Sequence, residues 1–260
     1  MNHPATGEPT PATPRKRRGR RIVAWVLASI GALIVVAVVG FLLWANIGVM
    51  AAEPDALAAV RADQDVTVTD AGGAWVLAPA SGESDTGLVF IPGAKVDPLA
   101  YAATLVGVVE EGATVVITKP TLNLAFFDKR PLATFTADAP GVDRWFVGGH
   151  SLGGVRACML ADDPAVSGLV LFGSYCANDL TASGLEVLSI AGSRDGLSTP
   201  EKIADARGML PADADLVEIE GLNHAGFGDY GVQPGDNTAT IPTGQQRDEI
   251  TDALATVLGR

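Results

Sequence analysis

Residues 148–154 have the sequence Gly-Gly-His-Ser-Leu-Gly-Gly, and the other patterns in the chain are best understood from this stretch. The apolar residues before it, 144–147, are typical of a buried strand, and residues 155–161 after it are typical of a helix. A Gly-x-Ser-x-Gly sequence between a strand and a helix predicts a sharp turn that holds the serine hydroxyl clear of the sheet. The flanking glycines fit because a Cβ beside such a turn would collide with the neighbouring strand or helix. We therefore predict that Ser151 is a nucleophile, and the alternative is a glycine-rich turn with a passive serine.

Short apolar segments alternate with helical segments on both sides of this turn. Continuous apolar strands separated by helices predict an α/β fold with a mostly parallel sheet and helices on both faces. Residues 66–69 and 75–77 are expected to form an antiparallel hairpin ahead of it. The other expected strands are 88–91, 114–118, 144–148, 168–172, 187–191 and 216–219, and the expected helices are 98–110, 152–161, 200–210 and 245–258.

A serine nucleophile needs a base, and the folded part of the chain contains two histidines, His150 and His224. His150 directly precedes Ser151, and the backbone direction there makes it a poor base for its neighbour. His224 follows the last expected strand, where a loop residue reaches over the strand ends. His224 is therefore the predicted base, and the alternative is that it is an ordinary structural or surface histidine.

The base in turn needs an acceptor that orients it, and Asp195 is the predicted acid. It lies in an Asp-Gly sequence directly after the expected strand 187–191, where the plain alternative is a simple turn. The order of serine, aspartate and histidine along the chain is the order expected for this architecture. Asp179, which follows the preceding strand, is the rival acid.

An oxyanion needs two amide donors. Leu152, the residue after the nucleophile, supplies one amide. The loop 92–95 supplies the other, with Ala94 as the predicted donor and Lys95 as the next choice. No metal cluster, phosphate loop or dinucleotide motif occurs in the sequence, so neither a metal nor another cofactor is expected.

The turn around Ser151, the Asp195 turn and the His224 loop together resemble the α/β-hydrolase superfamily, over about residues 65–259. The resemblance implies a Ser-Asp-His hydrolase on an α/β-hydrolase fold. Three stretches are similar to a bacterial branch related to dienelactone-hydrolase-like proteins, namely IPGAKVDP at 91–98, TKPTLNLAFFD at 118–128 and HAGFGDYG at 224–231. Dienelactone hydrolases themselves carry a cysteine nucleophile whereas this chain has a serine, so their activity is not carried over.

The same resemblance bears on substrate access. Many superfamily members insert a lid at the position of residues 173–185, but this segment is too short for one, so no separate lid domain is expected. The long insertion near the strand ends is 122–142. Its Leu124, Phe126 and Phe127 are expected either to line an acyl pocket or to pack in the core.

The N-terminal region has the pattern of a membrane anchor. Residues 1–14 are rich in proline, threonine and alanine, and residues 15–21 contain six basic side chains. Residues 22–44 contain no charge, and at about 1.5 Å per residue such a helix spans about 35 Å, enough for a bilayer core. Trp25 and Trp44 near its ends suit the two membrane interfaces.

An uncleaved anchor is favoured over a cleaved signal peptide. The apolar region of a signal peptide usually has only about 7–15 residues, and the nearest candidate cleavage site, 49–51, lies well past this run. Because positive charge stays inside, we expect a disordered cytoplasmic tail at 1–21, a membrane helix at 22–44 and the hydrolase domain, 65–260, outside the cytoplasm. Between the last two we expect a stalk or linker, 45–64, with a short helix.

Charge and cysteine content narrow the class further. The net charge is −12, and residues 1–21 hold six basic residues and Glu8, so the other 239 residues carry −17. A domain this acidic is a poor candidate for nucleic-acid binding. Cys158 and Cys176 are too few for a disulfide scaffold. They are expected either to pair, if the domain lies outside the cytoplasm, or to be two buried thiols.

These observations predict a membrane-anchored, extracytoplasmic serine hydrolase that acts on an ester or similar small acyl compound. An acyltransferase with the same triad is one alternative. A catalytically idle hydrolase fold that serves as a binding module is the other, and the intact order of Ser151, Asp195 and His224 argues against it. Nothing in the sequence specifies the substrate or the oligomeric state.

Overall fold

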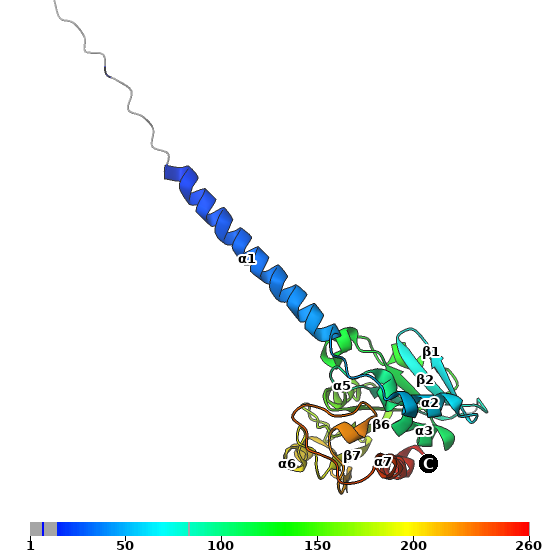
Figure 1. Ribbon diagram of the computed structural model, residues 1–260. Helices are drawn as coiled ribbons and strands as arrows, with labels where there is room; N and C mark the ends of the chain where they lie inside the picture. The colour runs from blue at the N-terminus through cyan, green and yellow to red at the C-terminus, as the bar shows by residue number, and fades with distance from the viewer. Residues whose placement is uncertain (1–6, 8–14, 83, 260) are drawn as a thin grey trace, which may run out of the picture. The chain divides into compact units, whose positions relative to one another are not determined.

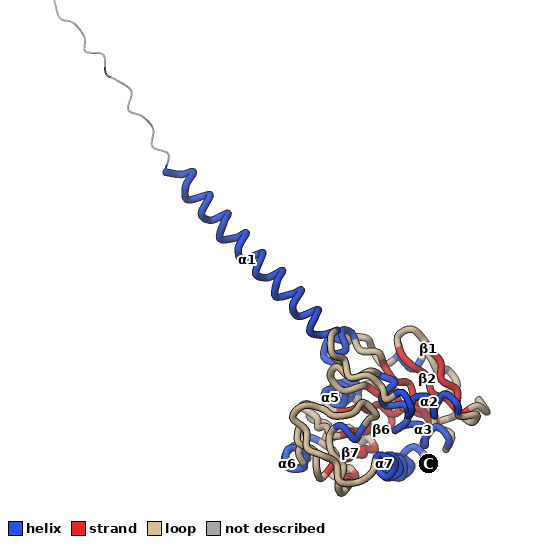
Figure 2. The backbone as a smooth tube through the Cα atoms, in the orientation of Figure 1, coloured by secondary structure: helices blue, strands red, loops and turns tan. Residues whose placement is uncertain are grey.

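The computed structural model describes residue 7, residues 15–82 and residues 84–259, with the backbone alone for residues 15–18. Its internal contacts divide the chain into two units, with the boundary between Trp44 and Ala45. Figures 1 and 2 show both units.

The first unit consists of helix α1 (Arg15–Asn46), whose last two residues belong to the second unit. Residues 15–21 are helical, whereas we expected them to be disordered. Lysine and arginine are good helix formers, and an apolar helix that follows them extends easily through them. The expected disorder of residues 1–14 falls, apart from Gly7, outside the described residues. Residues Gly19–Asn46 are long and apolar enough to cross a membrane, and a signal sequence would pass the same test.

The second unit is built on one eight-stranded sheet with the strand order β1-β2-β4-β3-β5-β6-β7-β8. β1 pairs with β2 and β2 with β4 in antiparallel fashion, and every later pairing is parallel. The predicted hairpin and mostly parallel sheet are therefore confirmed. The strands are β1 (Val66–Asp70), β2 (Ala74–Pro79), β3 (Thr86–Ile91), β4 (Thr114–Thr118), β5 (Arg144–His150), β6 (Val166–Phe172), β7 (Glu186–Gly192) and β8 (Asp215–Ile219).

Helices cover both faces of the sheet, as Figure 2 shows. Successive residues of β3 point to opposite faces, so Leu88 and Phe90 enter one core cluster while Val89 and Ile91 enter the other. The first cluster includes residues of α2, α3 and α7, and the second includes residues of α4 and α5. The helices of this unit are α2 (Pro54–Ala62), α3 (Ala102–Glu110), α4 (Ala133–Thr136), α5 (Leu152–Leu160), α6 (Pro200–Asp205) and α7 (Thr243–Leu258).

Residues 45–64 pack into the second unit and do not form the separate stalk that we expected. Val60 of α2 is 3% exposed and belongs to the first core cluster. The Met50 N–H donates to the Lys95 carbonyl (2.8 Å), and the Glu53 N–H donates to the Asp229 carbonyl (2.7 Å). The segment packs against the domain and is not a free linker, because it carries apolar side chains that the domain can bury.

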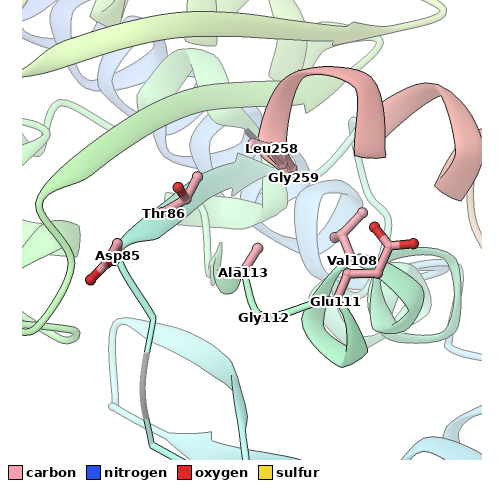
Figure 3. A pocket seen from close by; sticks show the side chains of 8 residues that line it. All are labelled: Asp85, Thr86, Val108, Glu111, Gly112, Ala113, Leu258 and Gly259. Carbon is pink, nitrogen blue, oxygen red and sulfur yellow. The ribbon is translucent and has the colours of Figure 1, made fainter.

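A pocket opens at the amino end of β3, beside the end of α7 (Figure 3). This is the edge of the sheet opposite to the carboxyl end of β5, where Ser151 follows the strand. The pocket is therefore not the substrate site of the predicted triad. Its lining residues are Asp85, Thr86, Val108, Glu111, Gly112, Ala113, Leu258 and Gly259.

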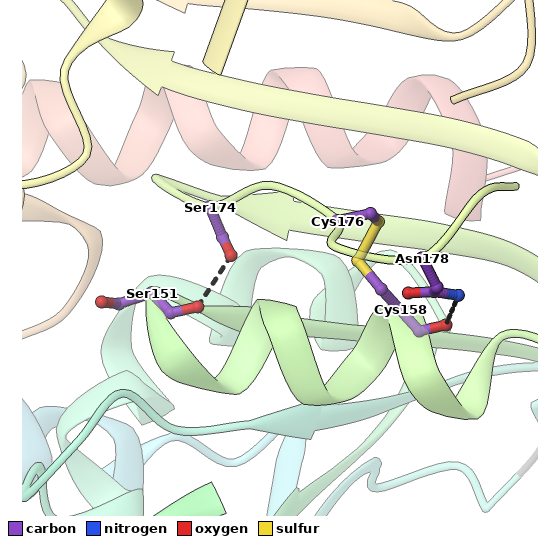
Figure 4. The surroundings of a disulfide bond; sticks show 5 residues. All are labelled: Ser151, Cys158, Ser174, Cys176 and Asn178. Atoms are coloured by element: carbon purple, nitrogen blue, oxygen red, sulfur yellow. Dashed lines mark hydrogen bonds between the residues drawn. A yellow bond between two sulfur atoms is a disulfide. The ribbon is translucent and has the colours of Figure 1, made fainter. Parts of the chain in front are cut away.

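A disulfide joins Cys158 of α5 to Cys176 in the loop after β6 (Figure 4). The two Cα atoms lie 5.5 Å apart, and the bond closes a sequence separation of 18 residues. Next to it the Asn178 side-chain amide donates to the Cys158 carbonyl at 3.0 Å. The bond therefore ties the helix that follows Ser151 to the loop between β6 and β7.

We expect reduction of this disulfide to lower the free energy of unfolding by about 3 kcal/mol, because closing a loop of this length restricts the unfolded chain. Urea denaturation of the full chain in detergent, with and without reductant, measures the difference. The matched control is the double variant Cys158→Ala/Cys176→Ala, whose stability should not respond to reductant. A wild-type stability that is equally insensitive to reductant would contradict this prediction.

Candidate active site

The predicted site residues follow four different strands at one edge of the sheet. Ser151 comes after β5 and the loop 92–95 after β3. Asp195 comes after β7 and His224 after β8. Because these strands are parallel, their carboxyl ends lie at the same edge, which is where open α/β sheets bind ligands.

The turn at Ser151 has a strained backbone. Ser151 has φ of 52° and ψ of −122°, in a region that side-chain-bearing residues rarely adopt. The helix behind it lies so close to β3 that a Cβ on Gly153 would overlap the Ile91 carbonyl oxygen. Two hydrogen bonds hold the turn, from the Ser151 N–H to the Phe172 carbonyl (3.0 Å) and from the Ser174 hydroxyl to the Ser151 carbonyl (2.7 Å; Figure 4).

The structure pairs His224 with Asp195. Nδ1 of His224 lies 2.7 Å from Oδ2 of Asp195, and both side chains are fully buried. The other oxygen, Oδ1, accepts the N–H groups of Leu197 (2.8 Å) and Ser198 (2.7 Å). With Nδ1–H donating to the carboxylate, the lone pair of the neutral ring resides on Nε2, the atom that a general base uses.

Nε2 of His224 is buried and has no hydrogen-bond partner among the described residues. The Ser151 hydroxyl therefore makes no hydrogen bond to Nε2 of His224, the predicted base, in this structure. The ring of His224 instead lies beside that of His150, the residue before the serine, with ring centroids 4.3 Å apart. The His224 ring thus reaches the turn that carries Ser151, and catalytic hydrogen bonds in unliganded enzymes are often long until substrate binds.

The rival acid, Asp179, is engaged elsewhere. Its carboxylate accepts hydrogen bonds from the Thr181 N–H (2.9 Å) and the Thr181 hydroxyl (2.7 Å). The hydroxyl bond, with help from the N–H, holds the pKa of Asp179 below its ordinary value. Asp179 is an exposed residue that stabilises its own turn.

The loop after β3 has one amide left for an oxyanion. The Gly93 N–H donates to the Tyr101 hydroxyl (3.0 Å), and the Lys95 N–H donates to the Asn123 carbonyl (2.8 Å). Ala94 lies at the corner of a turn that the Val96 N–H closes on the Gly93 carbonyl. Within the described chain the Ala94 N–H donates to no atom, which favours Ala94 over Lys95 as the donor.

The amide of Leu152 is the counterpart of the Ala94 amide. Leu152 is the first residue of α5, so its N–H has no acceptor inside the helix, and it makes no other hydrogen bond within the described residues. A helix N-terminus also favours negative charge. The two open amides therefore come from the loop after β3 and from the first residue of the helix that directly follows Ser151.

Sequence reasoning missed a buried hydrogen-bond chain behind these amides. The Tyr101 hydroxyl accepts the Gly93 N–H (3.0 Å) and is also hydrogen-bonded to Nδ1 of His150 (2.9 Å). Burial, with the nearby His224 as a further cause, lowers the pKa of His150 well below 6.5, and burial raises the pKa of Tyr101. The neutral pair therefore joins the loop after β3 to the turn of Ser151. The only signal in the sequence was an aromatic residue in the helical segment after that loop.

A second missed residue, Asp236, joins the turn of Asp195 to the turn of His224. Its Oδ1 accepts the N–H of Gly196 (2.9 Å) and its Oδ2 accepts the N–H of Ala225 (2.8 Å). These are the residues directly after Asp195 and His224, so one carboxylate holds both turns in register. The sequence around it suggests only a turn, because nothing local shows that it reaches two distant amides.

The insertion 122–142 gives a mixed outcome. Leu124 is buried in the domain, which agrees with core packing. Phe126 and Phe127 are 58% and 45% exposed, so they do not pack in the core. Among the described residues there is no group of three or more His, Cys, Asp or Glu that could hold a metal ion.

The protonation of His150 can be tested by the pH dependence of stability. Burial keeps the folded ring neutral, whereas the unfolded chain takes up a proton below about pH 6.5, so stability is lost as the pH falls below that value. Urea denaturation at pH 7 and pH 5 should show that His150→Asn, which can still pair with the Tyr101 hydroxyl but does not titrate, loses less unfolding free energy than the wild type. An unchanged pH dependence would contradict a neutral buried His150.

Comparison with known proteins agrees with this architecture. A model of the alpha/beta hydrolase family matches residues 87–248, a range that holds Ser151, Asp195 and His224. A search of curated proteins finds no match. The matched range covers more than half of the chain and includes β3 to β8, so the chain belongs to the alpha/beta hydrolase family.

Proposed function

We propose that this chain is a membrane-anchored serine hydrolase that cleaves an ester or similar acyl compound. The observation that carries the proposal is the buried Asp195–His224 pair, whose open Nε2 belongs to a ring beside the Ser151 turn. A buried carboxylate, an imidazole oriented by it and a serine on a strained turn are the parts that acyl transfer needs.

In the proposed reaction, Nε2 of His224 takes the proton of the Ser151 hydroxyl while Oγ attacks the carbonyl carbon. The tetrahedral oxyanion accepts hydrogen bonds from the amides of Ala94 and Leu152. Each such bond stabilises the transition state by roughly 3–4 kcal/mol in comparable sites. Asp195 stabilises the imidazolium, which then protonates the leaving alcohol as the carbon–oxygen bond breaks. Water, deprotonated by His224, attacks the acyl-enzyme and releases the acid and the free serine.

We infer that α1 is the anchor, with its basic end in the cytoplasm and the second unit outside. The charge-free run 22–44 after a basic segment supports an anchor and this orientation. The Cys158–Cys176 disulfide supports the outside location, since disulfides persist in oxidising compartments. The stretches at 91–98, 118–128 and 224–231 support a further proposal, a relation to dienelactone-hydrolase-like proteins with serine as the nucleophile.

Replacing each candidate acid by its amide tests the proposed triad. Asp195→Asn keeps the shape but loses the charge that stabilises the imidazolium, and such changes have cost on the order of 10⁴ in rate. Asp179→Asn is the matched control and should change the rate by less than about threefold, as expected for an exposed turn residue. The measurement is hydrolysis of one short p-nitrophenyl ester near neutral pH, with circular dichroism to confirm folding.

Ser151→Ala belongs in the same assay, because members of a triad act as a unit. Ser151→Ala should remove nearly all hydrolysis of the ester, as Asp195→Asn should. A large loss for Asp179→Asn with a mild loss for Asp195→Asn would move the acid to the loop after β6. Retention of more than about a tenth of the rate by Ser151→Ala would overturn the nucleophile.

A further inference from the structure

The segment that enters the second unit runs along the edge of the sheet that carries the candidate site. The side-chain amide of Asn123 donates to the Ala45 carbonyl (3.2 Å). The Met50 N–H donates to the Lys95 carbonyl (2.8 Å), and the Asp97 N–H donates to the Met50 carbonyl (2.9 Å). Residues 45–50 are therefore fixed to the loop that holds the open Ala94 amide.

This attachment limits how far the site can lie from the bilayer. In the anchor proposed above, the membrane span ends at Trp44. Ala45 is the next residue, and consecutive Cα atoms are only about 3.8 Å apart. Ala45 is itself fully buried in the second unit. The chain therefore contacts the loops at Asn123 and Lys95 within six residues of the end of this span, at Ala45 and Met50. A long flexible stalk, which would have separated them, is absent from the described chain between residues 45 and 64.

The loop next to this entry point exposes apolar side chains. Phe126 and Phe127 are 58% and 45% exposed, and Ile47 of the entering segment is 65% exposed. The exposure is fixed by the structure, because Leu124 and Ala125 are buried just before the two rings. After them the Arg156 guanidinium of α5 donates to the Asp128 and Arg130 carbonyls, both at 3.1 Å.

The charge at this surface suits phospholipid headgroups. The Lys129 ammonium lies 4.9 Å from the centre of the Phe126 ring, and Lys129 is exposed. An exposed cation beside an exposed aromatic ring can contact phosphate groups while the ring enters the apolar boundary. This local pattern contrasts with the net charge of −17 carried by residues 22–260.

We propose that Phe126 and Phe127 insert into the interface of the bilayer that holds α1, so that the candidate site faces this bilayer. The substrate is then an amphiphilic lipid ester that is taken from the membrane, with its acyl chain in the bilayer and its ester at the headgroup level. The inference rests on the proposed hydrolase and its anchor. A protein partner or a second copy of this chain is the competing occupant of the same surface.

Insertion is tested without any activity measurement. The full chain is placed in vesicles of phosphatidylcholine and phosphatidylglycerol that carry bromine on the acyl chains, which quenches nearby tryptophan. Phe126→Trp is compared with Leu216→Trp. Leu216 is 44% exposed and lies on β8, the last strand in the strand order of the sheet. After subtraction of the four native tryptophans, the added signal of Phe126→Trp should be quenched at least about twofold more, as insertion to the acyl boundary requires. Equal quenching of the two variants would overturn the proposal, and so would self-association that shields the introduced indole from the lipid.

The substrate class is tested with Phe126→Ser/Phe127→Ser, which removes the apolar surface and leaves the triad untouched. Hydrolysis of a soluble p-nitrophenyl butyrate should stay within about twofold of the wild type, while hydrolysis of a long-chain diacylglycerol in vesicles should fall by about tenfold or more. An unchanged vesicle rate, or equal losses on both substrates, would overturn the lipid assignment. A wild-type chain that is inert toward both esters would instead refute the proposed hydrolase, and the quenching comparison would still decide the insertion.

Discussion

The close approach of α5 to the end of β3 is the constraint around which the candidate site is built. A side chain at Gly153 would overlap the Ile91 carbonyl, so the helix can pack here only through glycine. The tight turn that results leaves Ser151 at a positive φ. It also points the open amide of Leu152 to the edge of the sheet where the loops gather. The same packing therefore exposes a hydroxyl and provides a donor for negative charge beside it.

Two polar contacts, one buried and one partly buried, keep the loops at this edge in register. Tyr101 and His150 join the loop after β3 to the serine turn, and Asp236 joins the turns of Asp195 and His224. Each contact satisfies backbone amides that would otherwise be buried without partners, so it contributes to folding as well as to the geometry of the site. Fixed amides and a fixed imidazole need little rearrangement when charge develops during a reaction.

The sequence predicted the sheet because its parallel strands are short, continuous apolar runs whose burial depends mainly on composition. It also favoured Asp195 over Asp179, since chain order and position after a strand are visible in the sequence, and the structure pairs His224 with Asp195. The packing of residues 45–64 against the rest of the second unit was not predicted, because a short helix gives no sign of which surface it will contact. The reach of Asp236 was hidden for the same reason, since its two amide donors lie 40 and 11 residues away.

The central claim is that Ser151 is activated by the Asp195–His224 pair, and covalent labelling tests it most directly. A fluorophosphonate reacts only with a serine whose hydroxyl is activated, and peptide mass spectrometry locates the modified residue. The account predicts stoichiometric labelling of Ser151 in the full chain, with labelling slowed by at least about 10³-fold in His224→Ala, in line with losses measured for triads. An unlabelled wild-type chain, or labelling of Ser151 that does not depend on His224, would contradict the account.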